Sequence, residues 1–278
     1  MLSPFLVFGI VLSAITVILK GFSGIPAVLF GILFFILYSI LGLIILCVIL
    51  SFMALSVKDI ESIQQKDSPL FRKMTVFALN TAMKLINVRA SVEGVGQIPS
   101  GRFLLVQNHR SMFDPLISLC VLDKYQLGFI TKPENMKIPV IGKFAHRICA
   151  LPIDRENPRN AVKTINAAAD YIKNDVCSIG LYPEGTRNRS DTASLLPFHN
   201  ASLKIATKAG CPIVVTTIFK TDIIKRRAPF RRTNVVIKVC GVIPAEDVKA
   251  SSTAELSVMC RRLLCEGMGI DFNEEENG

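Results

Sequence analysis

The most apolar part of the chain is its beginning. Residues 1–57 contain one charged side chain, Lys20, and no acid. Residues 20–24 separate an apolar run at 1–18 from a run of 33 uncharged residues at 25–57. Because about 20 apolar residues cross the core of a bilayer, the second run is long enough for one span and the first is just long enough. This pattern predicts a membrane anchor, either a helical hairpin that returns to its starting side or one span preceded by a re-entrant or interfacial helix.

Basic residues follow the apolar segment directly, beginning with Lys58 and Lys66. Positive residues beside a span favour the cytoplasmic face, so we expect residues 58–278 to form a domain on the cytoplasmic side of a membrane. A cleaved signal peptide is not expected, because no basic region precedes the first apolar run.

Beyond the leader, the apolar residues alternate between the two-residue period of strands and the 3.6-residue period of helices. Strand patterns occupy residues 90–95, 103–107, 126–131, 149–153, 178–182, 212–219 and 234–242. Helical patterns occupy residues 71–86, 115–122, 158–173, 200–209 and 246–265. Alternating strands and helices predict an α/β domain with a mixed, largely parallel sheet flanked by helices.

Charge separates the two parts of the chain further. Residues 58–278 carry 31 basic and 22 acidic side chains, and five of the eight residues at 225–232 are basic. A basic domain behind an apolar leader favours work against an anionic membrane surface or anionic substrates over nucleic acid as a partner. The stretch 225–232 is expected either to be a solvated loop or to contact anionic headgroups. The eight cysteines are scattered without a Cys-x-x-Cys pair, which favours reduced, buried thiols.

One histidine and one carboxylate stand in a single connection, at His109 and Asp114. They lie between a predicted buried strand and a helix that opens at Pro115. On a continuous helix this spacing would place them about 140° apart, whereas a turn lets the carboxylate reach the imidazole. Held that way, Asp114 fixes the tautomer of a general base. The alternative is that Asp114 only caps the helix and His109 is a polar turn residue.

Further polar clusters follow other predicted strands, which is where open α/β sheets bind ligands. Lys132 follows one strand and leads to Pro139-x-x-Gly142, and Arg155 follows the next. The sequence Pro-Glu-Gly-Thr-Arg occupies 183–187 after a third strand. Ser111 is a conceivable nucleophile, but a Gly-x-Ser-x-Gly elbow is absent from the sequence.

Taken in order, His-x4-Asp at 109–114, Lys132 before Pro139-x-x-Gly142, Pro-Glu-Gly-Thr-Arg at 183–187 and Pro-Ile-Val at 212–214 resemble the four motifs of the glycerolipid acyltransferases. The similarity is greatest to 1-acylglycerol-3-phosphate acyltransferases and covers residues 70–245. Tyr182 stands where the family usually has phenylalanine, Asn188 where serine is common, and Val215 where a second proline is common.

The resemblance implies a role for each matching residue. His109 would be the base and Asp114 its partner. Substrate binding would fall to Lys132, Glu184, Gly185, Thr186 and Arg187, with Arg155 as a further candidate, and Pro212 would line the acyl-chain pocket. In this set Lys132 and Arg187 would hold the substrate phosphate, because a point charge and a guanidinium fork together suit a phosphomonoester.

The implied enzyme is a membrane-bound acyltransferase that acylates lysophosphatidate and forms phosphatidate. Its donor would be acyl-CoA or acyl carrier protein, and we expect no metal or other cofactor. Acylation of glycerol 3-phosphate or of another lysophospholipid is the nearest alternative. A non-catalytic membrane tether with a basic face is an alternative of another class, and it would not need the His109/Asp114 pair.

Overall fold

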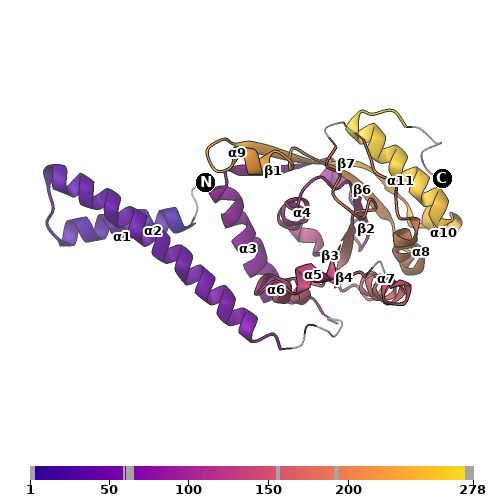
Figure 1. The fold of residues 1–278 in the computed structure, drawn as a ribbon, viewed down its shortest axis with the longest axis horizontal. Helices are drawn as coiled ribbons and strands as arrows, with labels where there is room; N and C mark the ends of the chain where they lie inside the picture. The colour runs from indigo at the N-terminus through magenta and orange to yellow at the C-terminus, as the bar shows by residue number, and fades with distance from the viewer. Residues whose placement is uncertain (1–3, 59, 61–65, 155–156, 191–193, 273–278) are drawn as a thin grey trace.

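The computed structural model describes residues 4–58, 60, 66–154, 157–190 and 194–272, and Figure 1 shows an apolar helical hairpin projecting from an α/β domain. The hairpin pairs α1 (Pro4–Leu19) with α2 (Gly24–Leu55). The turn between them uses Gly21 and Gly24 at φ values of 67° and 60°, which glycine adopts without strain. A hydrogen bond of 2.9 Å joins the hydroxyls of Thr16 and Tyr38 across the two helices.

By length and composition, α2 could cross a membrane. Its 32 residues extend about 48 Å at 1.5 Å per residue, whereas the 16 residues of α1 extend about 24 Å, less than the 30 Å core of a bilayer. Both apolar runs thus form helices that pack as a hairpin, and their passage through a membrane, once or twice, stays a prediction. The C-terminal end of α2 packs against the α/β domain. Ala54 in its last turn and Val57 just beyond it are buried there.

Seven strands form the sheet, as the apolar pattern predicts. They are β1 (Val88–Glu93), β2 (Leu104–Gln107), β3 (Leu127–Thr131), β4 (Leu151–Pro152), β5 (Ser178–Leu181), β6 (Ile213–Phe219) and β7 (Thr233–Ile243). Their order is β1-β7-β6-β2-β5-β3-β4, and every neighbouring pair is parallel except β6 and β7. The sheet is mixed and largely parallel, so the predicted fold class is confirmed. The carboxyl ends of β2, β3, β5 and β6 lie at the same edge.

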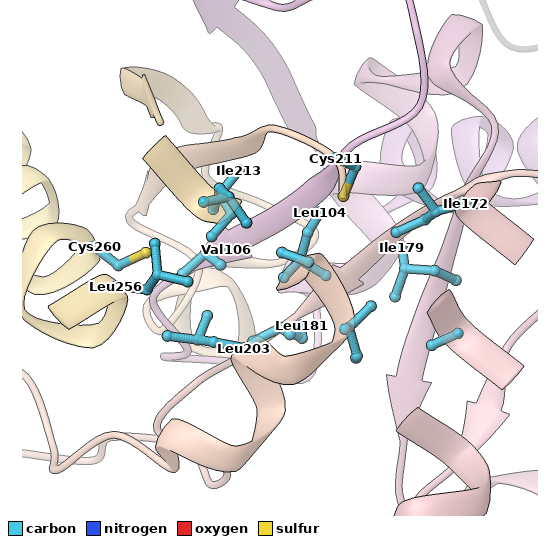
Figure 2. Close-up of a cluster of buried hydrophobic side chains, with 14 of the residues drawn as sticks. Leu104, Val106, Ile172, Ile179, Leu181, Leu203, Cys211, Ile213, Leu256 and Cys260 are labelled. Atoms are coloured by element: carbon cyan, nitrogen blue, oxygen red, sulfur yellow. The ribbon is translucent and has the colours of Figure 1, made fainter. Parts of the chain in front are cut away.

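Helices cover both faces of the sheet. Figure 1 shows α3 (Pro69–Leu85), α4 (Asp114–Val121) and α6 (Ile141–Arg147) on one face and α7 (Pro158–Lys173), α8 (Lys204–Ala209) and α11 (Thr253–Met268) on the other. The shorter helices are α5 (Pro133–Met136), α9 (Ile224–Arg227) and α10 (Ala245–Ala250), with 3-10 turns at η1 (Val95–Gln97), η2 (Asp123–Tyr125) and η3 (Asn200–Leu203). Strand β2 is central: Leu104 and Val106 pack towards α7, α8 and α11 (Figure 2), whereas Leu105 packs on the side of α3 and α4.

Two helical predictions need correction in their detail. The pattern at 246–265 forms two helices, because Ser252 starts α11 with a capping box in which its side chain and that of Glu255 bond each other's backbone amides. The pattern at 200–209 begins as a 3-10 turn and ends, as predicted, at Gly210 in the left-handed conformation. Five of the eight cysteines are buried, as expected of structural thiols, whereas Cys47 is exposed on α2.

A buried ion pair attaches α3 to the sheet. The guanidinium of Arg72 donates to both carboxylate oxygens of Asp67 at 2.7 and 2.8 Å, and to the carbonyls of Leu127 at 2.9 Å and Ile148 at 3.3 Å. The two side chains are only 5% and 7% exposed. Arg72 therefore joins α3, the start of β3 and the end of α6.

We predict that Arg72→Met lowers the free energy of unfolding by about 3–5 kcal/mol, because Asp67 would be left charged and buried without its partner. The neighbouring Lys73 is exposed on the same helix and provides the matched control, Lys73→Met. Urea unfolding of both variants in the same detergent would measure the difference. Equal losses in the two variants would show that the Arg72 ion pair does not hold α3.

Candidate active site

The connection between β2 and α4 closes on the carboxylate of Asp114. One oxygen, Oδ2, accepts hydrogen bonds of 2.8 Å from Nδ1 of His109 and from the backbone N–H groups of Arg110 and Ser111. Asp114 is fully buried and the His109 side chain is 17% exposed. Because a carboxylate only accepts, Nδ1 carries the proton and Nε2 of the neutral imidazole keeps its lone pair.

This geometry differs from that of a helix cap. Asp114 is the first residue of α4, and the residue at the capping position is Phe113, which has no side-chain cap. The carboxylate therefore does not serve as an N-cap; it binds the imidazole and the amides of the turn. The positive end of the α4 dipole also favours a negative charge at this position.

Buried amide side chains tie the turn to the rest of the sheet. Asn108 donates to the carbonyl of Ile218 at 3.2 Å and accepts from its N–H at 2.7 Å. Gln107 donates to the Thr216 hydroxyl at 3.1 Å and accepts from Ser118 on α4 at 2.9 Å. We did not assign these residues from sequence, although two amides at the end of an apolar strand are a signal, since buried polar groups need partners.

Glu184 supports the backbone of His109 from the opposite side. The turn that carries it has proline second and glycine fourth, with Gly185 donating to the Tyr182 carbonyl at 3.0 Å. The buried carboxylate accepts from the N–H of His109 at 2.8 Å and from that of Leu196 at 3.0 Å. Burial raises the pKa of Glu184, while these amide bonds lower it. Both of its oxygens thus bind amides of the protein, one of them that of His109.

An aromatic stack lies against the imidazole. The rings of His109 and Tyr182 have centroids 4.1 Å apart at 20°, and Phe129 continues the stack behind Tyr182 at 5.8 Å and 13°. Gly180 makes room for it, because a Cβ there would lie 2.4 Å from the Phe129 ring. The Tyr182 hydroxyl is buried and has no hydrogen-bond partner in the described structure. Burial and, secondarily, the charge of Asp114 raise the pKa of this phenol, so it is neutral at physiological pH.

The other predicted site residues lie at two different edges of the sheet. Lys132 follows β3, and Thr186 and Arg187 follow β5; all three are exposed at the carboxyl edge that also carries His109. Arg155 lies outside the described residues. Pro212 precedes β6 at the opposite edge, where its carbonyl accepts from Leu104 at the start of β2.

The structure therefore does not bring Pro212 to the imidazole. Pro212 lies beside the start of β2 and His109 follows its end, so the length of the strand, about 10 Å, separates them. The register of the strands determines which residues share an edge of the sheet, and the order of the motifs along the chain does not. Pro212 could only line the far end of an acyl-chain pocket.

Comparison with known proteins agrees with this arrangement. Residues 89–218, which contain the His109 turn and the Glu184 turn, match the acyltransferase family. By this similarity the chain contains an acyltransferase domain. It is 28% identical over 167 residues to a 1-acyl-sn-glycerol-3-phosphate acyltransferase of Salmonella typhimurium, covering 59% of this chain and 66% of that one. It is 26% identical over 176 residues to the 1-acyl-sn-glycerol-3-phosphate acyltransferase alpha of Ovis aries, covering 62% of this chain and 60% of that one.

A solved structure extends the similarity beyond the matched segment. The 1-acyl-sn-glycerophosphate acyltransferase PlsC from Thermotoga maritima superimposes with a TM-score of 0.57 at 26% identity, over 80% of this chain and 86% of that one. The first curated relatives, in contrast, are matched over less than two thirds of their own length. The acyltransferase fold is thus shared over most of the chain.

Arg110 was not assigned from sequence. Its backbone N–H helps to hold Asp114, and its half-buried guanidinium donates to the carbonyl of Ser190 at 3.0 Å. Arg110 therefore joins the His109 turn to the loop after β5 and adds a positive charge beside Glu184, whose pKa it lowers. Its position directly after His109 was the available signal.

A groove of about 450 Å³ opens at the end of β6 and is lined by Glu93, Phe219, Lys220, Asp222, Ile223, Val236 and Lys238. It begins one residue beyond Ile218, which holds Asn108. The groove is thus next in sequence to a support of the catalytic turn, although neither His109 nor Asp114 lines it.

We predict that His109→Ala lowers kcat for acyl transfer by about 10²- to 10⁴-fold, the usual contribution of a positioned general base. Asp114→Asn should be nearly as damaging, because an amide does not stabilise an imidazolium as a carboxylate does. Steady-state assays would compare both with Met112→Ala, which alters an exposed side chain in the same turn. Near-normal turnover in a folded His109 variant contradicts the role of the pair.

For the aromatic stack, the expected outcome is a difference between two substitutions. Tyr182→Phe keeps a ring against His109 and should retain kcat within about twofold. Tyr182→Leu removes a π face worth about 0.5–2 kcal/mol to an adjacent cation, so kcat should fall about 2- to 30-fold. If the two variants lose kcat equally while both stay folded, the stack does not stabilise the imidazolium.

Proposed function

We propose that the protein is a membrane-bound 1-acylglycerol-3-phosphate O-acyltransferase. It transfers a fatty acyl group from an acyl thioester to the free hydroxyl of lysophosphatidate and releases phosphatidate. The observation that carries the proposal is the 2.8 Å hydrogen bond from His109 to buried Asp114, which leaves Nε2 available as a base. The relatives whose names describe this activity give it independent support.

In the proposed reaction, Nε2 of His109 takes the proton of the acceptor hydroxyl as its oxygen attacks the thioester carbonyl. The carbon–sulfur bond then breaks, and the proton passes from Nε2 to the departing thiolate. Asp114 keeps the imidazole in the required tautomer and stabilises the imidazolium between the two proton transfers. The face of Tyr182 lies against the same ring and favours the same cation.

The attacking group is the substrate hydroxyl and not a serine of the protein. The nearest serine, Ser111, is buried, and its hydroxyl accepts from the N–H of Phe113 at 3.4 Å. In the described structure it makes no hydrogen bond to His109, so nothing activates it. A single transfer step without an acyl-enzyme is the simpler chemistry for this site.

Lys132 and Arg187 are the proposed phosphate ligands. The alternative was that they form structural ion pairs with Asp154 or Glu184. Both oxygens of Glu184 bind backbone amides, and neither cation has an ion-pair partner among the residues that the structure describes. Two exposed cations at the edge that carries His109 suit a phosphomonoester, with Arg187 supplying a bidentate fork.

The substrates and the location of the enzyme complete the proposal. The donor is acyl-CoA or acyl carrier protein, and the apolar hairpin holds the domain at a membrane, on its cytoplasmic face. Acylation of glycerol 3-phosphate or another lysophospholipid is the alternative within the family. A non-catalytic tether is disfavoured because it has no use for a buried carboxylate bonded to an imidazole.

An assay of the purified full-length protein in mixed micelles separates these possibilities. Lysophosphatidate, glycerol 3-phosphate and lysophosphatidylcholine would each be offered with acyl-CoA and with acyl carrier protein carrying the same chain. Phosphatidate formation that is lost in His109→Ala supports the proposal. Turnover with only one of the other acceptors would identify that acceptor as the substrate in place of lysophosphatidate. No turnover with any combination of acceptor and donor would support the tether.

We predict that Arg187→Lys weakens the use of lysophosphatidate by about 1–3 kcal/mol in kcat/KM, because it keeps the charge but loses the fork. The loss should appear in KM for the acceptor as well as in kcat, while KM for the donor barely changes. Arg189→Ala removes an exposed cation two residues away and is the matched control.

Monoacylglycerol, which lacks the phosphate, provides the second comparison. Wild-type enzyme should strongly prefer lysophosphatidate, and Arg187→Ala or Lys132→Ala should reduce that preference. If one variant keeps the full preference, the substituted residue does not contact the phosphate.

A further inference from the structure

The loop that joins β6 to β7 combines positive charge with an exposed aromatic ring. Lys225, Arg226, Arg227, Arg231 and Arg232 are all exposed in it. Phe230 lies among them and is 92% exposed. An exposed phenyl ring among cations suits a surface that offers both anionic groups and apolar depth.

The base of this loop is firmly attached to the domain. Ile224 is completely buried, and it packs in one cluster with Ala228 and with Met83 and Ile86 at the end of α3. The N–H of Thr233, where the loop ends, donates to the carbonyl of Asn87 at 3.0 Å. The loop and the end of α3 are therefore fixed next to each other.

Helix α3 connects the loop to the apolar hairpin. Leu70, Phe77 and Leu85 are 61%, 39% and 44% exposed and recur at seven- and eight-residue spacing, so they form one apolar stripe. Phe77 in this stripe contacts Phe5 of α1, with ring centroids 6.4 Å apart. Figure 1 shows the hairpin, α3 and α9 at the same end of the molecule.

We propose that residues 225–232 form a second membrane contact, in which the five cations bind anionic lipid headgroups and Phe230 enters the interface. The proposal rests on the proposed placement of the hairpin in a bilayer. An acidic protein would match the charge equally well. The lipid surface is favoured because the apolar stripe of α3 is continuous with the hairpin, and only a membrane covers both.

This contact would orient the catalytic edge of the sheet. The loop leaves β6 just beyond Ile218, whose backbone holds Asn108 beside His109. The groove lined by Phe219, Ile223 and Lys220 lies at the base of the same loop. Docking at residues 225–232 therefore brings the edge that carries His109 towards the surface where an amphiphilic phosphate ester resides.

A tryptophan reporter tests the contact directly, because the chain contains no tryptophan. The full-length Phe230→Trp variant would be reconstituted in vesicles of phosphatidylcholine alone or with phosphatidylglycerol. Emission of the introduced indole should shift to shorter wavelength and be quenched by brominated acyl chains, more strongly in the anionic vesicles. Val162→Trp, at a position that is 54% exposed on α7, is the control and should show neither change.

Charge removal in the Phe230→Trp background tests the electrostatic part. Each cation near an anionic surface strengthens attachment by about fivefold, so Arg226→Gln with Arg231→Gln should lower the ratio of quenched to unquenched indole by about 25-fold. Lys204→Gln with Lys208→Gln removes two exposed cations from α8 and should leave the quenching unchanged. An indole at position 230 that is not quenched in either vesicle overturns the proposal.

Enzyme activity of the same Phe230→Trp protein separates this proposal from the proposed function. Normal phosphatidate formation with an unquenched indole overturns the membrane contact alone. A quenched indole without acyl transfer overturns the acyltransferase proposal alone. If the indole is unquenched and the two arginine substitutions raise KM for acyl carrier protein in micelles, the loop binds the protein donor, and the lipid contact is wrong.

Discussion

The buried carboxylate of Asp114 is the constraint on which the catalytic turn depends. A charge without exposure to water must be paired and hydrogen-bonded, and three donors converge on its Oδ2. Two of these donors are amides of the turn itself, so the chain between β2 and α4 can close only around the carboxylate. The imidazole is the third donor, and its tautomer follows from the same requirement. The orientation of the His109 ring is therefore fixed by the protein itself.

Sheet topology then determines which residues can lie at the same edge as His109. Strands β2, β3 and β5 are parallel neighbours, so their carboxyl ends deliver His109, Lys132 and Arg187 to one edge. Strand β6 is also parallel to β2, and its Ile218 fixes Asn108 at that edge. Pro212 belongs to the same motif series but directly precedes β6, so it lies at the other edge.

Much of this architecture could be predicted because its signals are local. Each strand has its own apolar run, and α7 begins and ends at the residues that its helical pattern predicts, 158 and 173. His109 and Asp114 are only five residues apart. Contacts between distant segments could not be predicted. The stacking of Tyr182 on His109 and the bond from His109 to Glu184 join residues more than 70 positions apart, and no spacing rule relates them. The antiparallel pairing of β6 with β7 is likewise a property of register and not of pattern.

Two buried acids, Glu184 and Asp114, lie beside His109, and they differ in which part of the histidine they bind. Glu184 receives one amide on each oxygen, and burial raises its pKa, so its charge is only partly supported. Asp114 receives two amides and the imidazole on a single oxygen at the start of a helix. A carboxylate that stabilises an imidazolium must bond the ring, and of the two acids it is Asp114 that does so. Glu184 bonds the backbone of the same histidine, so it fixes where the ring stands while Asp114 determines what the ring can do.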